Sequence, residues 1–144
     1  MGLAHGAVAY RTSGVAPRLT GPLLAVTGLV VWSGLSAWGG MDAHAAGFRL
    51  REAWDSGAYF YLGIPLMALA VGLAAYHAPR RPWRWPLWLV AGHQAGVLLV
   101  GLGMQSGLSL LILTLALAIL LAVIFAVPAL AGSMVARRVL QRSG

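Results

Sequence analysis

The fold of this chain is decided by the stretch His77-Ala78-Pro79-Arg80-Arg81-Pro82-Trp83-Arg84-Trp85-Pro86-Leu87-Trp88. Three arginines, three prolines and three tryptophans stand here between two long apolar runs. The hydrocarbon core of a bilayer does not tolerate such a charge cluster, whereas tryptophan favours the membrane–water interface. We therefore expect a tight turn at a membrane surface, and the rest of the chain can be oriented from it.

The composition is that of an integral membrane protein. Of the 144 residues, 60% are hydrophobic and 9% are charged, whereas about 25% are charged in ordinary soluble domains. The mean hydropathy is +0.81. A soluble fold of this length, which suffices for one domain, could not cover so much apolar surface. There is no cysteine, which excludes disulfide exchange and cysteine-ligated metal clusters.

Four apolar runs predict four transmembrane helices in a single domain. Each run approaches or exceeds the length of about 20 residues that a helix needs to cross a bilayer. The predicted helices span residues 19–40, 58–78, 87–104 and 108–136, with an external loop at 41–57 and a turn at 79–86. The last two should be antiparallel neighbours, because the turn between them is very short. The fold class is therefore all-α, an integral membrane bundle with antiparallel up-and-down topology. The fourth run is long enough to tilt or to project beyond the membrane.

The arginines orient this bundle. Eight of the ten lie in the N-terminal arm, the central turn and the C-terminal tail, and these segments contain no acidic residue. The loop at 41–57 holds the other two arginines and all three acidic residues. The positive-inside rule then places both termini and the central turn in the cytoplasm. The net charge is +7. Because most of the arginines lie beside apolar runs, where they can contact anionic lipid headgroups, we expect no nucleic-acid partner.

A cleaved signal peptide is the alternative interpretation of the first apolar run. Ala43-His44-Ala45 resembles a signal-peptide cleavage site. The run is longer than a typical signal core, however, so we favour a retained helix.

His93 and Gln94 are polar residues about two turns inside the third run. Ionisable residues at that depth are rare and often functional. They could ligate a haem or a metal, relay protons or contact a substrate. The simpler interpretation, which we favour, is a neutral histidine that hydrogen-bonds to a neighbouring helix. His77 lies nearer the surface and His44 on the opposite side, so we expect no bis-histidine haem site, no metal and no other cofactor.

An acidic and aromatic cluster precedes the second run. Two carboxylates three residues apart, beside an arginine and aromatic rings, could bind a cation or a headgroup or do acid–base work. Helix capping, ion pairing and an aromatic belt explain the same residues, and without a nucleophile the catalytic signal is weak. The cluster comprises Arg51, Glu52, Trp54, Asp55 and Tyr59.

Glycines approximate a stripe on the third run. Small residues let membrane helices approach closely, so this stripe predicts a packing surface. Its members are Gly92, Gly96, Gly103 and Gly107.

The basic and aromatic residues of the central turn exceed what orientation alone requires. We predict that they contact anionic lipid or an acidic partner. They are Arg80, Arg81, Trp83, Arg84 and Trp85.

Several short patterns follow one another between residues 50 and 105. They are Glu52-Ala53-Trp54-Asp55 followed by Tyr59, then Gly63 and Pro65, then Pro79, Arg81, Pro82, Trp83, Arg84 and Trp85, then Gly92 and Gln94. This order resembles small uncharacterised four-helix inner-membrane proteins of bacteria. The resemblance implies a bacterial inner-membrane location and brings no known activity.

Three classes of function fit the sequence. The favoured one is a non-catalytic accessory subunit or assembly factor of a larger membrane complex, whose partners are other subunits or copies of itself. A nearly featureless fourth helix, the glycine stripe and the shortage of reactive groups motivate it. The alternative is a small oligomeric transporter or channel with His93 and Gln94 along a polar path. A membrane enzyme using Glu52 and Asp55 has the least support, so we do not expect an enzyme.

The predicted orientation is tested by single cysteines, since the natural chain has none. A cysteine at Asp42 should react with a membrane-impermeant thiol reagent added to intact cells, and a cysteine at Arg84 should react only after the membrane is opened. The reverse pattern would overturn the orientation.

Overall fold

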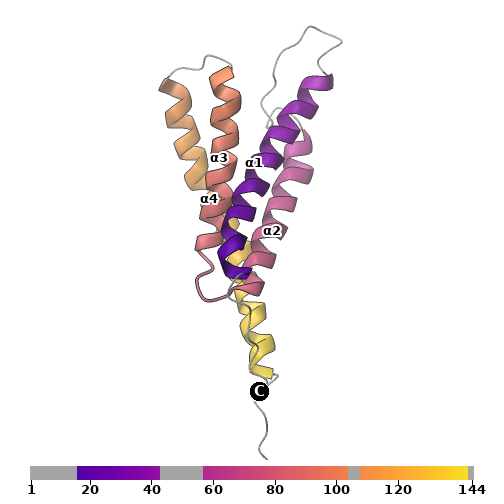
Figure 1. Ribbon diagram of the computed structural model, residues 1–144, viewed down its shortest axis with the longest axis vertical. Coiled ribbons are helices and arrows are strands. Elements are labelled where there is room, and N and C mark those ends of the chain that lie inside the picture. Colours follow the sequence, from indigo (N-terminus) through magenta and orange to yellow (C-terminus); the bar gives the residue numbers. More distant parts are fainter. Residues whose placement is uncertain (1–15, 43–56, 104–107, 143–144) are drawn as a thin grey trace, which may run out of the picture.

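The structure, a computed structural model, describes residues 16–42, 57–103 and 108–142, and the side chains of 19–38, 57–99 and 112–142. Throughout these residues the regular structure is helical, which confirms the all-α class. The elements are α1 (Ala16–Asp42), the π-helical turn η3 (Tyr59–Gly63), α2 (Ile64–His77), α3 (Arg84–Gly103) and α4 (Leu108–Arg142). Figure 1 shows them as one elongated bundle.

Three segments are long and apolar enough to cross a membrane, within the part of the chain that the structure describes. They are Leu19–Trp38, Tyr59–His77 and Ile112–Arg142. The remaining helix, α3, has 20 residues and packs among these segments. His93 and Gln94 lie at its middle.

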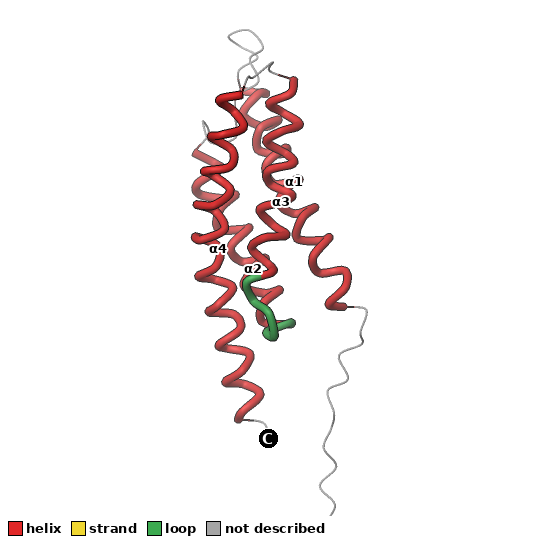
Figure 2. Tube along the Cα trace, turned by 90° about the vertical axis from the view of Figure 1, so that its left-hand side faces the viewer, coloured by secondary structure: helices red, strands yellow, loops and turns green. Residues whose placement is uncertain are grey.

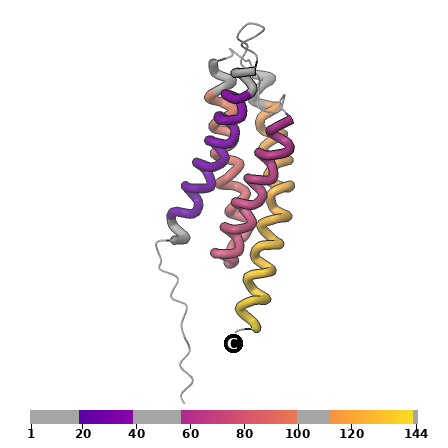
Figure 3. Tube along the Cα trace, turned by 90° about the vertical axis from the view of Figure 1, so that its right-hand side faces the viewer, coloured from indigo at the N-terminus to yellow at the C-terminus, as the bar shows by residue number. Residues whose placement is uncertain are grey.

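Several helix boundaries differ from the predicted ones, and α3 begins at Arg84 rather than at residue 87. The first helix begins at Ala16 rather than at residue 19, and Pro17 in its first turn suits a helix start. The last helix continues to Arg142 rather than ending at 136. Arg137, Arg138 and Arg142 therefore lie on a helix and not in a tail, because residues 133–142 contain no glycine or proline and are mostly good helix formers. In Figures 2 and 3, α4 extends beyond the end of α2.

The closest helix pairs are not consecutive in the chain. The most extensive contacts join α1 to α3 and α2 to α4. Because successive helices alternate in direction, each of these pairs is parallel (Figure 1). The antiparallel neighbours α3 and α4 also pack together, as predicted, but less extensively. The bundle is therefore held mainly across its alternate helices.

Glycine makes the contact between α1 and α3 possible. A Cβ atom on Gly28 would overlap the carbonyl oxygen of Leu89, and a Cβ atom on Gly92 would overlap the carbonyl oxygen of Ala25. The two backbones thus touch directly at both places. In a membrane this close packing contributes much of the attraction between helices, since lipid is as apolar as the side chains.

The predicted glycine stripe is only partly described. Gly92 lies at the backbone contact, and Gly96 faces the ring of Trp32, whose Cδ1 atom would be 2.9 Å from a Cβ atom at position 96. Gly103 ends α3, but its surroundings lie outside the described side chains, as does all of Gly107.

A second glycine contact joins α2 to α4. A Cβ atom on Gly132 would overlap the carbonyl oxygen of Gly72, while one on Gly72 would lie 3.5 Å from the carbonyl oxygen of Pro128. Pro128 stands inside α4, which continues past it as one helix.

The central turn is closed by Trp85. Its side chain is 4% exposed, and its Nε1–H donates a hydrogen bond to the Ala78 carbonyl oxygen at 3.2 Å. The prediction that Trp85 contacts lipid or a partner is therefore wrong, because the indole belongs to the core. The guanidinium of Arg137 donates to the Pro79 carbonyl oxygen at 3.4 Å, which ties α4 to the same turn.

Replacement of Gly92 by alanine should lower the free energy of unfolding by about 1–3 kcal/mol, because the added methyl group forces α1 away from α3. Denaturation in mixed micelles would measure this change. Gly34→Ala is the matched control, since a Cβ atom at Gly34 meets nothing within 4 Å. Equal effects of the two substitutions would contradict the close contact.

Candidate functional site

The centre of the bundle holds a buried imidazole–phenol pair. His93 on α3 is fully buried, and Tyr59 in η3 is 3% exposed. The His93 Nε2 atom and the Tyr59 hydroxyl oxygen are 2.8 Å apart and share a hydrogen bond. This is the hydrogen bond to a neighbouring helix that the simpler interpretation of His93 predicts. It joins α3 to the turn that begins the second membrane segment.

Trp32 on α1 encloses this pair. Its ring meets His93 edge to face, with centroids 4.8 Å apart and planes at 65°. It meets Tyr59 in the same way, at 5.5 Å and 84°. Edge-to-face contacts contribute beyond the burial of area, by about 0.5–1.5 kcal/mol each. Three rings from three separate elements therefore pack as one aromatic centre, which we call the Trp32–Tyr59–His93 centre.

The glycines of α1 and α3 bring Trp32 to His93. A Cβ atom on Gly28 would lie 2.8 Å from the backbone nitrogen of His93, so α1 crosses α3 at the histidine itself. Trp32 follows Gly28 by one helical turn and uses the space that Gly96 leaves open. A larger residue at either glycine would separate the rings.

The π-helical turn positions Tyr59. The backbone N–H of Ile64 bonds to the Tyr59 carbonyl oxygen, five residues back instead of the usual four. Pro65 follows directly and has no N–H. It could not donate a hydrogen bond in a regular helix either, so the wider turn costs no bond at that residue. Such turns are rare in proteins, and those that occur are often at functional sites.

The structure corrects the prediction for Tyr59. We predict from the sequence that it joins the external acidic cluster or the aromatic belt, but it points into the core, whereas Tyr61 is 86% exposed. The cause is the wider turn, which the apolar pattern does not indicate. The other members of that cluster, Arg51, Glu52, Trp54 and Asp55, lie outside the described residues.

Several buried polar atoms near the middle of the bundle have no hydrogen-bond partner among the described residues. They are His93 Nδ1, Ser36 Oγ and both amide atoms of Gln94. Each unsatisfied buried group costs about 1–3 kcal/mol. His93 can hold its proton on Nδ1, so that Tyr59 donates to Nε2, or on Nε2, so that the ring donates to the phenol oxygen. Either tautomer leaves Nδ1 unbonded within this set.

The chemistry open to this centre is limited. A proton can pass between the Tyr59 oxygen and His93 Nε2, but neither a nucleophile nor an acid follows in the described part of the centre. Among the described residues there is no group of three or more His, Cys, Asp or Glu that could hold a metal ion. The absence of a metal, a haem or another cofactor stays a prediction.

Trp32 and Ser36 are the residues that the sequence argument missed. They stand four residues apart on α1, so they share a face, and both are buried at 1% exposure. A tryptophan in the middle of an apolar run, rather than at its interfacial end, was the available signal.

Comparisons with known protein families, characterised proteins and solved structures found no match. The resemblance of residues 50–105 to bacterial four-helix membrane proteins therefore stays a prediction.

Replacement of Tyr59 by phenylalanine should lower the free energy of unfolding by about 1 kcal/mol, because His93 Nε2 then loses its partner while the ring packing is kept. Unfolding in mixed micelles would measure this. Tyr61→Phe removes an equivalent hydroxyl from an exposed side chain and should leave stability unchanged. A Tyr59 variant as stable as the Tyr61 variant would show that the hydrogen bond contributes nothing.

Proposed function

We propose that this protein is a non-catalytic accessory subunit or assembly factor of a larger complex in the bacterial inner membrane. In this proposal all four helices cross the membrane, and both termini and the central turn are cytoplasmic. The arrangement of charges supports it. The turn with Arg80 and Arg81 and the α4 segment with Arg137 and Arg138 lie at one end of the bundle, while Asp42 ends α1 at the other.

The observation that carries the proposal is the end of α4 that extends beyond α2. Its 35 residues span about 52 Å at about 1.5 Å per residue, whereas a bilayer with its headgroups is about 40–45 Å thick. Figures 2 and 3 show this end continuing straight beyond α2. The bundle therefore presents a protruding helix at its arginine-rich end.

The last turns of α4, which extend beyond α2, have the character of a docking surface. Val139 and Leu140 are 49% and 60% exposed, and Arg138 and Arg142 beside them are exposed as well. Exposed apolar groups flanked by cations favour a partner that offers an apolar surface with acidic residues around it. No acidic residue of this chain follows Asp55, so the complementary charge comes from elsewhere.

The use of the polar groups supports a non-catalytic role. His93 and Tyr59 bond to each other and are enclosed by Trp32, which leaves them little access to a substrate. A structural tie between helices accounts for their burial.

A transporter or channel remains the second candidate, because both amide atoms of Gln94 are buried without a partner among the described residues. A neighbouring copy of the chain or a polar path could satisfy that amide. This candidate predicts an assembly made only of copies of this chain, so the same purification separates the two functions.

Purification of the tagged chain in mild detergent should yield a complex with a different membrane protein. The double variant Val139→Ser with Leu140→Ser should reduce the yield of that partner about tenfold, the loss expected when about 1.4 kcal/mol of contact is removed. Quantitative mass spectrometry of the purified complex would measure it.

The matched control is Leu120→Ser with Val123→Ser, which alters two exposed apolar residues on the part of α4 that lies alongside the bundle. It should retain the partner. Recovery of the chain alone or only with its own copies, or equal loss of the partner in both double variants, would contradict the proposal.

A further inference from the structure

A shallow groove lies on the outer face of α3 at the arginine-rich end of the bundle. It has a volume of about 250 Å³ and is lined by Trp83, Arg84, Leu87, Trp88 and Ala91. Four of these residues recur at the spacing of one helical face, and Ala91 leaves the groove open because its side chain is small. The groove thus consists of an apolar strip that ends at one cation.

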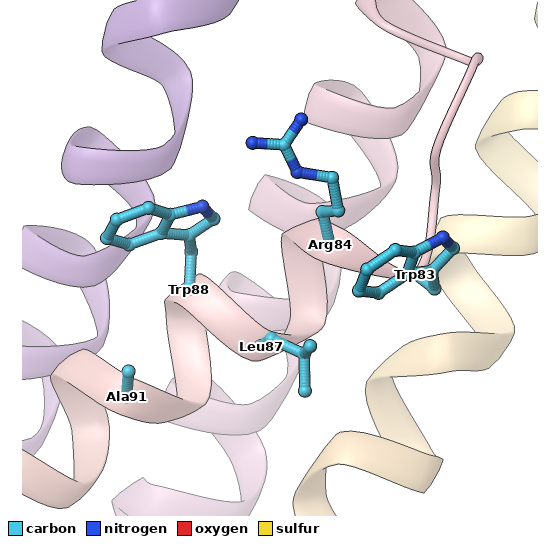
Figure 4. A pocket seen from close by; sticks show the side chains of 5 residues that line it. All are labelled: Trp83, Arg84, Leu87, Trp88 and Ala91. Atoms are coloured by element: carbon cyan, nitrogen blue, oxygen red, sulfur yellow. The ribbon is translucent and has the colours of Figure 1, made fainter.

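The side chains are arranged from polar to apolar along this strip. Figure 4 shows the Arg84 guanidinium pointing away from Ala91. Trp88 and Trp83 stand on opposite sides of Arg84 in this view, and Leu87 lies below it, between them. Trp88 reaches toward α1, where a Cβ atom on Gly21 would be 2.7 Å from its Nε1 atom. Since Gly21 leaves room there, the indole forms one wall of the groove.

Residues 57–142 supply no counterion for the charge of this end. They contain no aspartate or glutamate, while Arg80 and Arg81 precede Arg84 in the turn. The Arg84 side chain is exposed and carries a planar set of donors that matches a phosphate. An anion from outside the chain is therefore the complementary partner.

The apolar strip decides what kind of anion fits. Leu87 is 51% exposed and Trp88 is 41% exposed, and tryptophan favours the level of the headgroups. The groove is smaller than the about 300–1,000 Å³ of pockets that enclose whole ligands. It therefore suits an amphiphile that places its charged group on Arg84 and the start of its chain on Leu87 and Ala91.

We propose that this groove is a binding site for one anionic phospholipid, whose phosphate contacts Arg84 and whose acyl chain lies along Leu87 and Ala91 between Trp83 and Trp88. The site rests on the proposed membrane placement but not on the proposed partner of α4. It assigns Trp83 and Trp88 as walls of a lipid site, while Trp85 serves the core.

Native mass spectrometry of the full chain, released from micelles that contain equal amounts of phosphatidylglycerol and phosphatidylcholine, tests this proposal. The chain should retain one phosphatidylglycerol molecule in preference to phosphatidylcholine. Arg84→Gln should weaken retention about tenfold, the loss expected for one charge-assisted hydrogen bond. Ala91→Phe, which fills the groove without changing charge, should weaken it similarly. If the Arg84→Gln variant does not insert into the membrane, Arg84→Lys takes its place. Lysine keeps the positive charge but lacks the planar pair of donors that matches a phosphate, so retention should again be weaker.

The matched controls are Arg138→Gln and Ala116→Phe, which make the same changes at exposed positions of α4 and should leave retention unchanged. Equal retention of both lipids would overturn the proposal. So would displacement of phosphatidylglycerol by inorganic phosphate, which would indicate a free-anion site, or an unaltered Ala91→Phe variant, which would reduce the effect to general surface charge.

Discussion

The backbone contact between α1 and α3 brings the buried polar groups of the bundle together. Glycine stands at both crossing points, Gly28 facing Leu89 and Gly92 facing Ala25, and neither position has room for a Cβ atom. In lipid, apolar side chains gain nothing from leaving water, so attraction between helices depends on such close contact and on polar bonds. This pair therefore forms one half of the bundle, and α4 packs against it through α3.

The polar centre follows from that contact. Because Gly28 touches the backbone at His93, Trp32 one turn later lies against the imidazole ring. The phenol of Tyr59 completes the centre from the second segment, and the widened turn before Pro65 allows it to point inward. Packing and hydrogen bonding thus act together: the glycines create the space, and the Tyr59–His93 bond ties the second segment to the pair formed by α1 and α3.

The basic and aromatic residues at the central turn have two different roles. At the end with the central turn, Trp85 and Arg137 bond to the carbonyl groups of Ala78 and Pro79, so part of the basic and aromatic sequence holds the turn together. The remaining groups, Trp83, Arg84 and Trp88, face outward around the groove. One short stretch therefore serves both folding and the surface, and the division between the two roles runs between adjacent residues.

The helical class and the approximate helix positions follow from the sequence alone, because a backbone in lipid must satisfy its own hydrogen bonds and apolar runs of about 20 residues do so only as helices. His93 as a buried hydrogen-bonding residue is also predictable from its depth in the third run. The tertiary structure alone decided which helices pair, since many faces of an apolar run are equivalent until backbones approach at particular glycines. It also decided that Tyr59 and Trp85 point inward. Both are aromatic residues with a polar atom, equally suited to the interface. Only a hydrogen-bonding partner in reach, the imidazole of His93 for Tyr59 and the carbonyl of Ala78 for Trp85, made the interior the better place for them.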